Sequence, residues 1–110
     1  MLELILGNKT AERVLLHIYH YGEIHASAIS SDYKIALTPI LNQLNRFEMA
    51  GILISKEIGK ARLYSFNPKS AFTKPMMNII KIAYDNIPLE NKEKIFKIRR
   101  RPRRKGKPVK

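Results

Sequence analysis

Two groups of side chains in this sequence are suited to holding a polyanion without covalent chemistry. In the segment "LTPILNQLNRFEMAGIL", residues 37–53, Asn42, Gln43 and Arg46 lie off a stripe of apolar residues. Carboxamides can donate to and accept from adenine edges, whereas a guanidinium suits guanine or a phosphate. At the other end, residues 97–110 contain nine cations and no acid. Each cation that neutralises a phosphate releases counterions, and a flexible basic arm can do so without a fold.

The charge of the chain is concentrated in that tail. The 110 residues carry a formal charge of +12, and without the nine tail cations the remaining 12 basic and 9 acidic residues give +3. A basic protein of this kind meets nucleic acid more often than an anionic membrane surface. Its length fits one domain with a modest core.

Composition also excludes several classes of protein. There is no cysteine, which excludes disulfides and thiolate metal sites. No apolar run approaches the roughly 20 residues that span a bilayer. The start, "MLELILGNKT", lacks the basic region of a signal peptide. We therefore expect a cytoplasmic protein that does not enter a membrane.

Local signals mark helices in the first half of the chain. Asn8 can cap a helix over residues 9–21, and Gly22 can end it. The short segment "EIH", residues 23–25, could be a strand, and residues 26–33 offer a second helix. Thr38 followed by Pro39 predicts a third helix over residues 38–50, with Pro39 at the first helical position.

That third helix has a narrow apolar stripe. Ile40, Leu44 and Phe47 recur at i, i+4 and i+7, the spacing of one helix face. Gly51 then ends the helix. Leu41, beside the stripe, could contact a thymine methyl or pack inward.

The second half predicts a hairpin and a wide apolar helix. Residues 54–58 and 62–66 are β-prone, with Gly59 and Lys60 as the turn and Asn67–Pro68 ending the second strand. Thr73 and Pro75 repeat the signal for a helix start, and Pro88 breaks the helix that follows. Its apolar face is wider than one small domain needs, which favours a dimer interface over ordinary core. The residues expected there are Met76, Ile80, Ala83 and Ile87.

The order of these elements resembles the winged helix-turn-helix transcriptional regulators of bacteria and archaea, close to the ArsR and MarR types. The resemblance covers roughly residues 8–87 and rests on Leu44, "RFEMAGIL" (46–53) and "GKARLYSFNP" (59–68). It implies a mainly α fold with a small β-hairpin (α+β), a winged helix-turn-helix. The expected domains are a winged-helix DNA-binding domain over 1–87 with its dimerisation helix, a short helix or linker over 88–96, and a basic tail over 97–110.

The resemblance also implies a mechanism, in which the helix over 38–50 enters the major groove of double-stranded DNA. Thr38, Pro39 and the first-turn amides would lie at a phosphate, and Asn42, Gln43 and Arg46 would contact bases. Lys60 and Arg62 would form the wing, touching backbone or minor groove. The basic arm would add contacts through Arg99, Arg100, Arg101, Arg103, Arg104, Lys105 and Lys107. The family likeness implies a homodimeric repressor without a cofactor. It does not identify an effector ligand.

Other interpretations of the same residues remain open. The polar face of the third helix could be solvated, and the tail could serve solubility or carry a nuclear signal. Gly106, Lys107 and Pro108 resemble an AT-hook only weakly, because lysine replaces its arginine. The chain could instead be a non-specific architectural or RNA-binding protein dominated by its tail, or a winged helix that binds a protein partner.

The sequence contains few candidate residues for metal binding or catalysis. His17 and His20 are i, i+3 neighbours that could share a metal, with His25 nearby, but we expect histidines partly exposed on a helix surface and no metal. There is no glycine-rich phosphate loop, nucleophile elbow or metal-ligand cluster. We therefore do not expect an enzyme.

Overall fold

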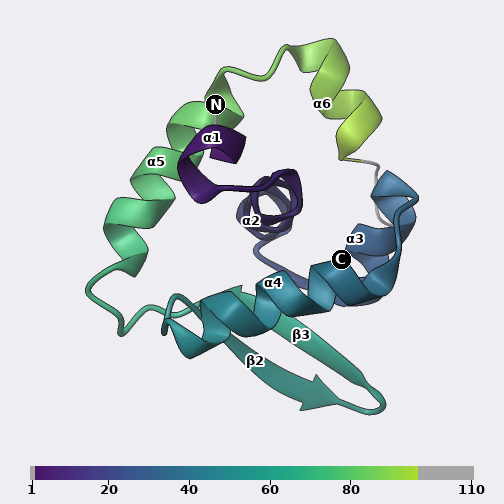
Figure 1. The fold of residues 1–110 in the computed structure, drawn as a ribbon, viewed down its shortest axis with the longest axis vertical. Coiled ribbons are helices and arrows are strands. Elements are labelled where there is room, and N and C mark those ends of the chain that lie inside the picture. The colour runs from purple at the N-terminus through teal and green to yellow at the C-terminus, as the bar shows by residue number, and fades with distance from the viewer. Residues whose placement is uncertain (1, 97–110) are drawn as a thin grey trace, which may run out of the picture.

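The computed structural model describes residues 2–96, arranged around one central helix. The elements run in the order α1 (Leu2–Leu6), α2 (Lys9–Tyr21), β1 (Glu23–His25), α3 (Ala26–Tyr33), α4 (Leu37–Met49), β2 (Leu53–Ile58), β3 (Ala61–Phe66), α5 (Thr73–Asp85) and α6 (Leu89–Ile95). Viewed along α2, the other elements surround it, with α1 and α5 on one side and α3 on the other (Figure 1). The helix α4 and the sheet close the lower side. The expected mainly helical fold with a hairpin is confirmed.

The central helix α2 has the ends that the sequence predicts. The Asn8 Oδ1 atom accepts a hydrogen bond from the Ala11 N–H at 2.6 Å, which satisfies one of the donors left unpaired at a helix start. Gly22 has φ of 85°, a conformation that suits glycine, and its N–H donates to the Ile18 carbonyl at 2.8 Å. Val14, Leu15 and Ile18 have no exposed surface. This helix therefore supplies the centre of the core.

The hairpin belongs to a three-stranded antiparallel sheet in the order β1-β3-β2. The short strand β1 adds to the free edge of β3, with Ile24 opposite Tyr64. Ile24, Leu53 and Tyr64 are buried on the inner face, whereas the far end of the hairpin is exposed. The sheet is thus anchored at one end and free at the other.

Two predicted helix starts are wrong in detail. The helix α4 begins one residue before Thr38, and Ala36 is its N-cap, so Pro39 is the third helical residue. Proline is tolerated there because the N–H groups of the first turn have no helical partner. Phe72 is the N-cap of α5, and Thr73 is 4% exposed within its first turn. The end of α5 at Asp85 precedes the predicted boundary at Pro88.

An aromatic cluster attaches α6 to α2. Phe96, the C-cap of α6, is 5% exposed and stacks on the His20 ring at a centroid distance of 4.3 Å. The Phe96 ring also contacts His17 and Tyr84, at 5.0 and 5.6 Å between centroids. His17 itself has no exposed surface, and its Nε2 atom lies 2.9 Å from Asp32 Oδ2. The expectation of a surface His17 is therefore wrong, because Asp32 on α3 and the Phe96 ring after α6 enclose it.

The environment of His20 predicts a loss of stability in acid. Burial is the main cause that lowers the pKa of His20 from 6.5, and the charges of His17 and Lys92 add to it. The unfolded chain then binds a proton at a higher pH than the folded chain does. Stability should fall as the pH drops through 6.5 towards the lower folded pKa. Melting temperatures on both sides of pH 6.5 would measure this, and His20→Gln should reduce the dependence more than His25→Gln.

No helix within residues 2–96 combines the length and the apolar character needed to cross a membrane.

Candidate nucleic-acid interface

The helix α4 presents a polar face opposite its buried stripe. Ile40 and Leu44 have no exposed surface and Phe47 is 5% exposed, so this stripe lies in the core. At 100° per residue, the opposite face carries Thr38, Asn42, Asn45, Arg46 and Met49, all of them exposed. Donors, acceptors and a cation therefore follow one another along a solvent-facing side of the helix.

The turn between α3 and α4 fixes the direction of that face. Lys34 adopts the left-handed conformation with φ of 58°, and its N–H donates to the Ser31 carbonyl at 3.3 Å. The Ser30 hydroxyl donates to the Ile35 carbonyl at 2.5 Å, which ties the end of α3 to the turn. Ile29 packs in the core without exposure. The pair α3–turn–α4 is therefore a helix-turn-helix unit held against α2.

The hairpin β2–β3 projects beyond the rest of the sheet beneath α4 (Figure 1). Lys60 at its turn and Arg62 on β3 are both exposed. The base of the hairpin is joined to the end of α4, because the Asn67 side chain donates to the Gly51 carbonyl at 2.8 Å. Gly51 has φ of 83° and ends α4 as the sequence predicts. Helix and wing are thus held in a fixed relation at this junction.

Arg62 is also tied to α4 through polar side chains. Its Nη1 atom donates to the Ser55 hydroxyl at 2.9 Å, and that hydroxyl donates to Glu48 Oε2 at 2.7 Å. A second guanidinium nitrogen lies 3.7 Å from Glu57 Oε2. These partners orient Arg62 and partly balance its charge. Sequence reasoning did not find Ser55 or Glu48, since their contact depends on the packing of β2 against α4.

Gln43 was expected on the exposed face of α4, but Asn45 lies there in its place. Gln43 is half-buried, and its Oε1 atom is enclosed without a hydrogen-bond partner among residues 2–96. Asn45 is exposed, three residues after Asn42 and seven after Thr38. Those intervals place it on the outer face, a signal that was present in the sequence. Leu41 is half-buried and packs against the core.

The apolar face of α5 lies differently from the expected dimer face. Ile80 has no exposed surface, so it belongs to the core of the protomer and its assignment to an interface is wrong. Met76, Ala83 and Ile87 are partly buried against that core. The exposed large hydrophobic residues of α5 are Ile79 and Ile82, at 40% and 63%.

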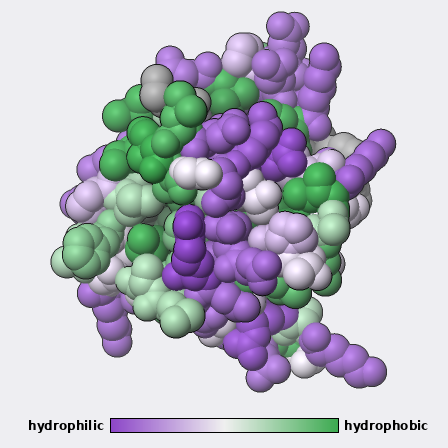
Figure 2. All heavy atoms as spheres, in the orientation of Figure 1, coloured by the Kyte–Doolittle hydropathy of each residue, from purple (hydrophilic) through white to green (hydrophobic). Residues whose placement is uncertain are grey.

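The first helix extends this exposed apolar surface. Leu4 and Ile5 of α1 are 86% and 62% exposed. Figure 2 shows hydrophobic side chains gathered at the upper left, over α1 and α5. We call Leu4, Ile5, Ile79 and Ile82 the α1–α5 patch.

His17 and His20 are engaged with other side chains. His17 pairs with Asp32, and His20 Nδ1 lies 2.7 Å from the Tyr84 hydroxyl. Within residues 2–96 no group of three or more His, Cys, Asp or Glu side chains is placed to hold a metal ion. The predicted arm residues, from Arg99 to Lys107, lie outside the described residues.

Comparisons with known proteins place this arrangement among solved folds. No protein-family model matches the chain, and no curated protein matches it. Its structure is similar to the crystal structure of the antimony-specific transcriptional repressor AntR, with a TM-score of 0.58 and 18% sequence identity. The match covers 74% of this chain and 72% of that one. The chain has the winged helix-turn-helix fold.

Proposed function

We propose that the protein is a double-stranded DNA-binding transcriptional regulator, acting as a homodimeric repressor in the cytoplasm. The observation that carries the proposal is the exposed polar face of α4, with Thr38, Asn42, Asn45 and Arg46 beside a projecting wing. A helix of this kind fits the major groove, where base edges present distinct donor and acceptor patterns. The likeness to a transcriptional repressor supports the same function.

Each element of the interface has a proposed role. Asn42, Asn45 and Arg46 contact base edges, and Gln43 stays on the flank. Thr38 and the amides at the start of α4 hold a phosphate, with Pro39 beside them. Lys60 and Arg62 on the wing contact the backbone or the minor groove, and the cations after Ile98 form a basic arm. Repression follows when a regulator so bound occupies the DNA that transcription needs.

Replacing Asn42 and Arg46 by alanine tests the base contacts. Selection from randomised duplexes should give a preferred site for the natural chain, since each bidentate contact discriminates by about 1–3 kcal/mol. The double variant should lose that preference and keep salt-sensitive, non-specific affinity. The conservative Arg46→Lys should also relax the preference, because an ammonium cannot make the bidentate contact.

Asn78→Ala supplies the matched control, since Asn78 is an exposed asparagine on α5. It should leave the selected site unchanged. If the natural chain selects no sequence, including from DNA upstream of its own gene, the regulator proposal fails. A non-specific architectural role then explains the charge better.

The α1–α5 patch is the surface we assign to the homodimer. Large exposed apolar areas mark interfaces, and a two-fold protein presents two reading helices to a symmetric site. Leu4→Glu combined with Ile79→Glu should shift the mass in solution from dimer to monomer, because carboxylates would be buried unpaired. Multi-angle light scattering measures this. Met49→Glu, at a side chain 89% exposed on α4, should leave the mass unchanged. A natural chain that is already monomeric would contradict the assignment.

A further inference from the structure

A cavity of about 670 Å³ lies between α2 and the helices at the two ends of the described chain. It is lined by residues of α1, α2, α5 and α6, by Tyr33 of α3, and by the α5–α6 turn, and no residue of α4 or the sheet contributes. Its volume is in the range of about 300–1,000 Å³ that is typical of small-molecule sites. The cavity is therefore separate from the DNA-reading face.

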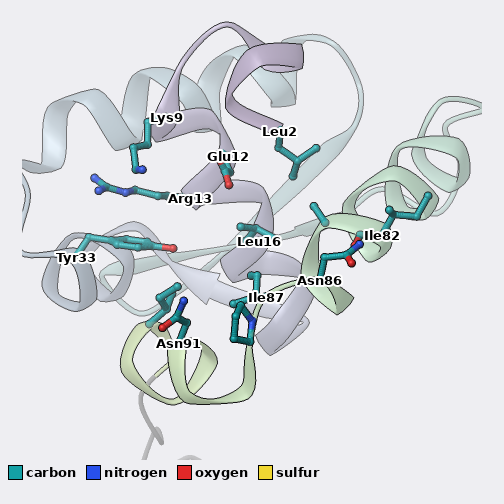
Figure 3. Close-up of a pocket in the computed structure, with 13 residues that line it drawn as sticks. Leu2, Lys9, Glu12, Arg13, Leu16, Tyr33, Ile82, Asn86, Ile87 and Asn91 are labelled. Atoms are coloured by element: carbon teal, nitrogen blue, oxygen red, sulfur yellow. The ribbon is translucent and has the colours of Figure 1, made fainter.

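One wall of the cavity carries hydrogen-bond donors. Figure 3 shows Lys9, Arg13 and Tyr33 together on one side, from α2 and α3. The Arg13 guanidinium carbon lies 4.7 Å from the centroid of the Tyr33 ring, a cation–π contact that holds both groups in place. Arg13 makes no ion pair within residues 2–96. Its donors are therefore not taken by an acid, and in Figure 3 they lie at the rim of the cavity, on the side of the Tyr33 ring away from Leu16.

The Tyr33 hydroxyl adds a donor to this wall. In Figure 3 its oxygen is directed towards the middle of the cavity, on the side of Leu16. Burial raises the pKa of Tyr33 well above its usual value, and the nearby Arg13 charge only partly offsets this. The hydroxyl consequently stays protonated and can donate a hydrogen bond to an anionic oxygen.

Most of the remaining lining is apolar, and Asn86 and Asn91 are its polar members. Leu2, Leu16, Ile82 and Ile87 are the main apolar residues there. A ligand lying there would remove these side chains from water, at roughly 25 cal/mol for each Å² of apolar surface buried. The acid Glu12 also lines the cavity, and Lys9 lies 4.0 Å from Glu3 Oε1 outside it, so Arg13 is the main cation of this wall.

From this division of the walls, we propose that the cavity binds a small amphipathic carboxylate. Its head group would accept hydrogen bonds from the Arg13 guanidinium and the Tyr33 hydroxyl, with Lys9 nearby. Its apolar body would lie between Leu16 and Ile82. A guanidinium matches a carboxylate with paired donors, which gives the site its preference for an anion. The site shares no residue with the proposed DNA-binding face, although Ile82 belongs to both the cavity and the α1–α5 patch.

An NMR titration of the full chain tests the proposal with three probes of one chain length. Decanoate should shift the amide signals of residues lining the cavity at lower concentration than 1-decanol or decylammonium does. We expect decanoate to bind about tenfold or more tightly than the alcohol, the difference that a charge-assisted hydrogen bond makes. The measurement does not involve DNA, so its failure and that of the regulator proposal are distinguishable.

Substitutions in the polar wall test whether the cavity prefers an anionic or a cationic ligand. Arg13→Gln should weaken decanoate binding about tenfold, and Tyr33→Phe, which keeps the ring, should weaken it less. Glu12→Gln should leave the affinity unchanged or raise it, because a like charge is removed. The melting temperature of each variant shows whether it remains folded.

Three results would overturn the proposal. One is no saturable shift with decanoate, and another is shifts spread over residues outside the cavity. The third is tighter binding of decylammonium that Glu12→Gln weakens, which would assign the cavity to a cation.

Discussion

Ending the chain after Phe96 should lower its affinity for duplex DNA and flatten the salt dependence of binding by several units. The nine cations of residues 97–110 are removed by this change. Each phosphate that the protein no longer neutralises reduces the slope of log affinity against log salt by about 0.9. Titrations of a fluorescent duplex by the full and shortened chains, across a salt series, measure both effects.

The position of the cut keeps the described fold intact. Phe96 is buried against His17 and His20, so the shortened chain retains the contacts that hold α6 to α2. A full-length chain with the tail residues in shuffled order keeps the charge and separates electrostatics from a tail motif. Coinciding curves for the full and shortened chains would show that the tail serves another purpose, and α4 with its wing would then account for all DNA affinity.

Asp32→Ala should destabilise the protein by about 3 kcal/mol, a large share of the stability of a domain this size. The Asp32 carboxylate lies 2.9 Å from His17 Nε2, and their side chains are 3% and 0% exposed. Removing one partner of a buried pair costs more than the pair contributes, because the other polar group stays in a poorly solvating interior. Urea denaturation followed by circular dichroism measures the loss.

A neighbouring substitution provides the comparison. Ser31→Ala changes an exposed side chain one residue earlier in α3 and should alter stability by less than about 0.5 kcal/mol. Equal stability for Asp32→Ala and the natural chain would mean that the buried pair contributes little to holding α3 against α2.

Local signals in the sequence were sufficient for most helix and strand boundaries. Asn8 and Gly22 bound α2 as predicted, because a cap and a left-handed glycine act within a few residues. The Gly59–Lys60 turn likewise located the hairpin. The predicted start of α4 at Thr38 was wrong by one residue. A threonine before a proline has the local pattern of a helix cap, but the turn after α3 starts the helix at Leu37.

Burial by distant segments was not predictable in the same way. His17 looked like a surface residue because Asp32 and Phe96, which enclose it, are remote in sequence. Ile80 and Ile79 are adjacent on the same helix, and only the packing of α5 against α2 decides which is core and which is exposed. The base contacts of Asn42 and Arg46 stay predictions, as does the role of the tail.

The pairing of β1 with β3 has a consequence for how the molecule unfolds. His25 lies opposite Leu63, so α3, α4 and β2 all fall within a loop of chain closed by these two strands. Detaching α4 takes Ile40 and Leu44 out of the core and leaves the chain between these strands as a long unpacked loop. The helix α4 should therefore belong to the last cooperative unit to open, with its central amide hydrogens exchanging on global unfolding. The short helix α6 is not enclosed by strand pairing. Its amides should therefore exchange through smaller openings that leave the helix-turn-helix unit and the sheet folded.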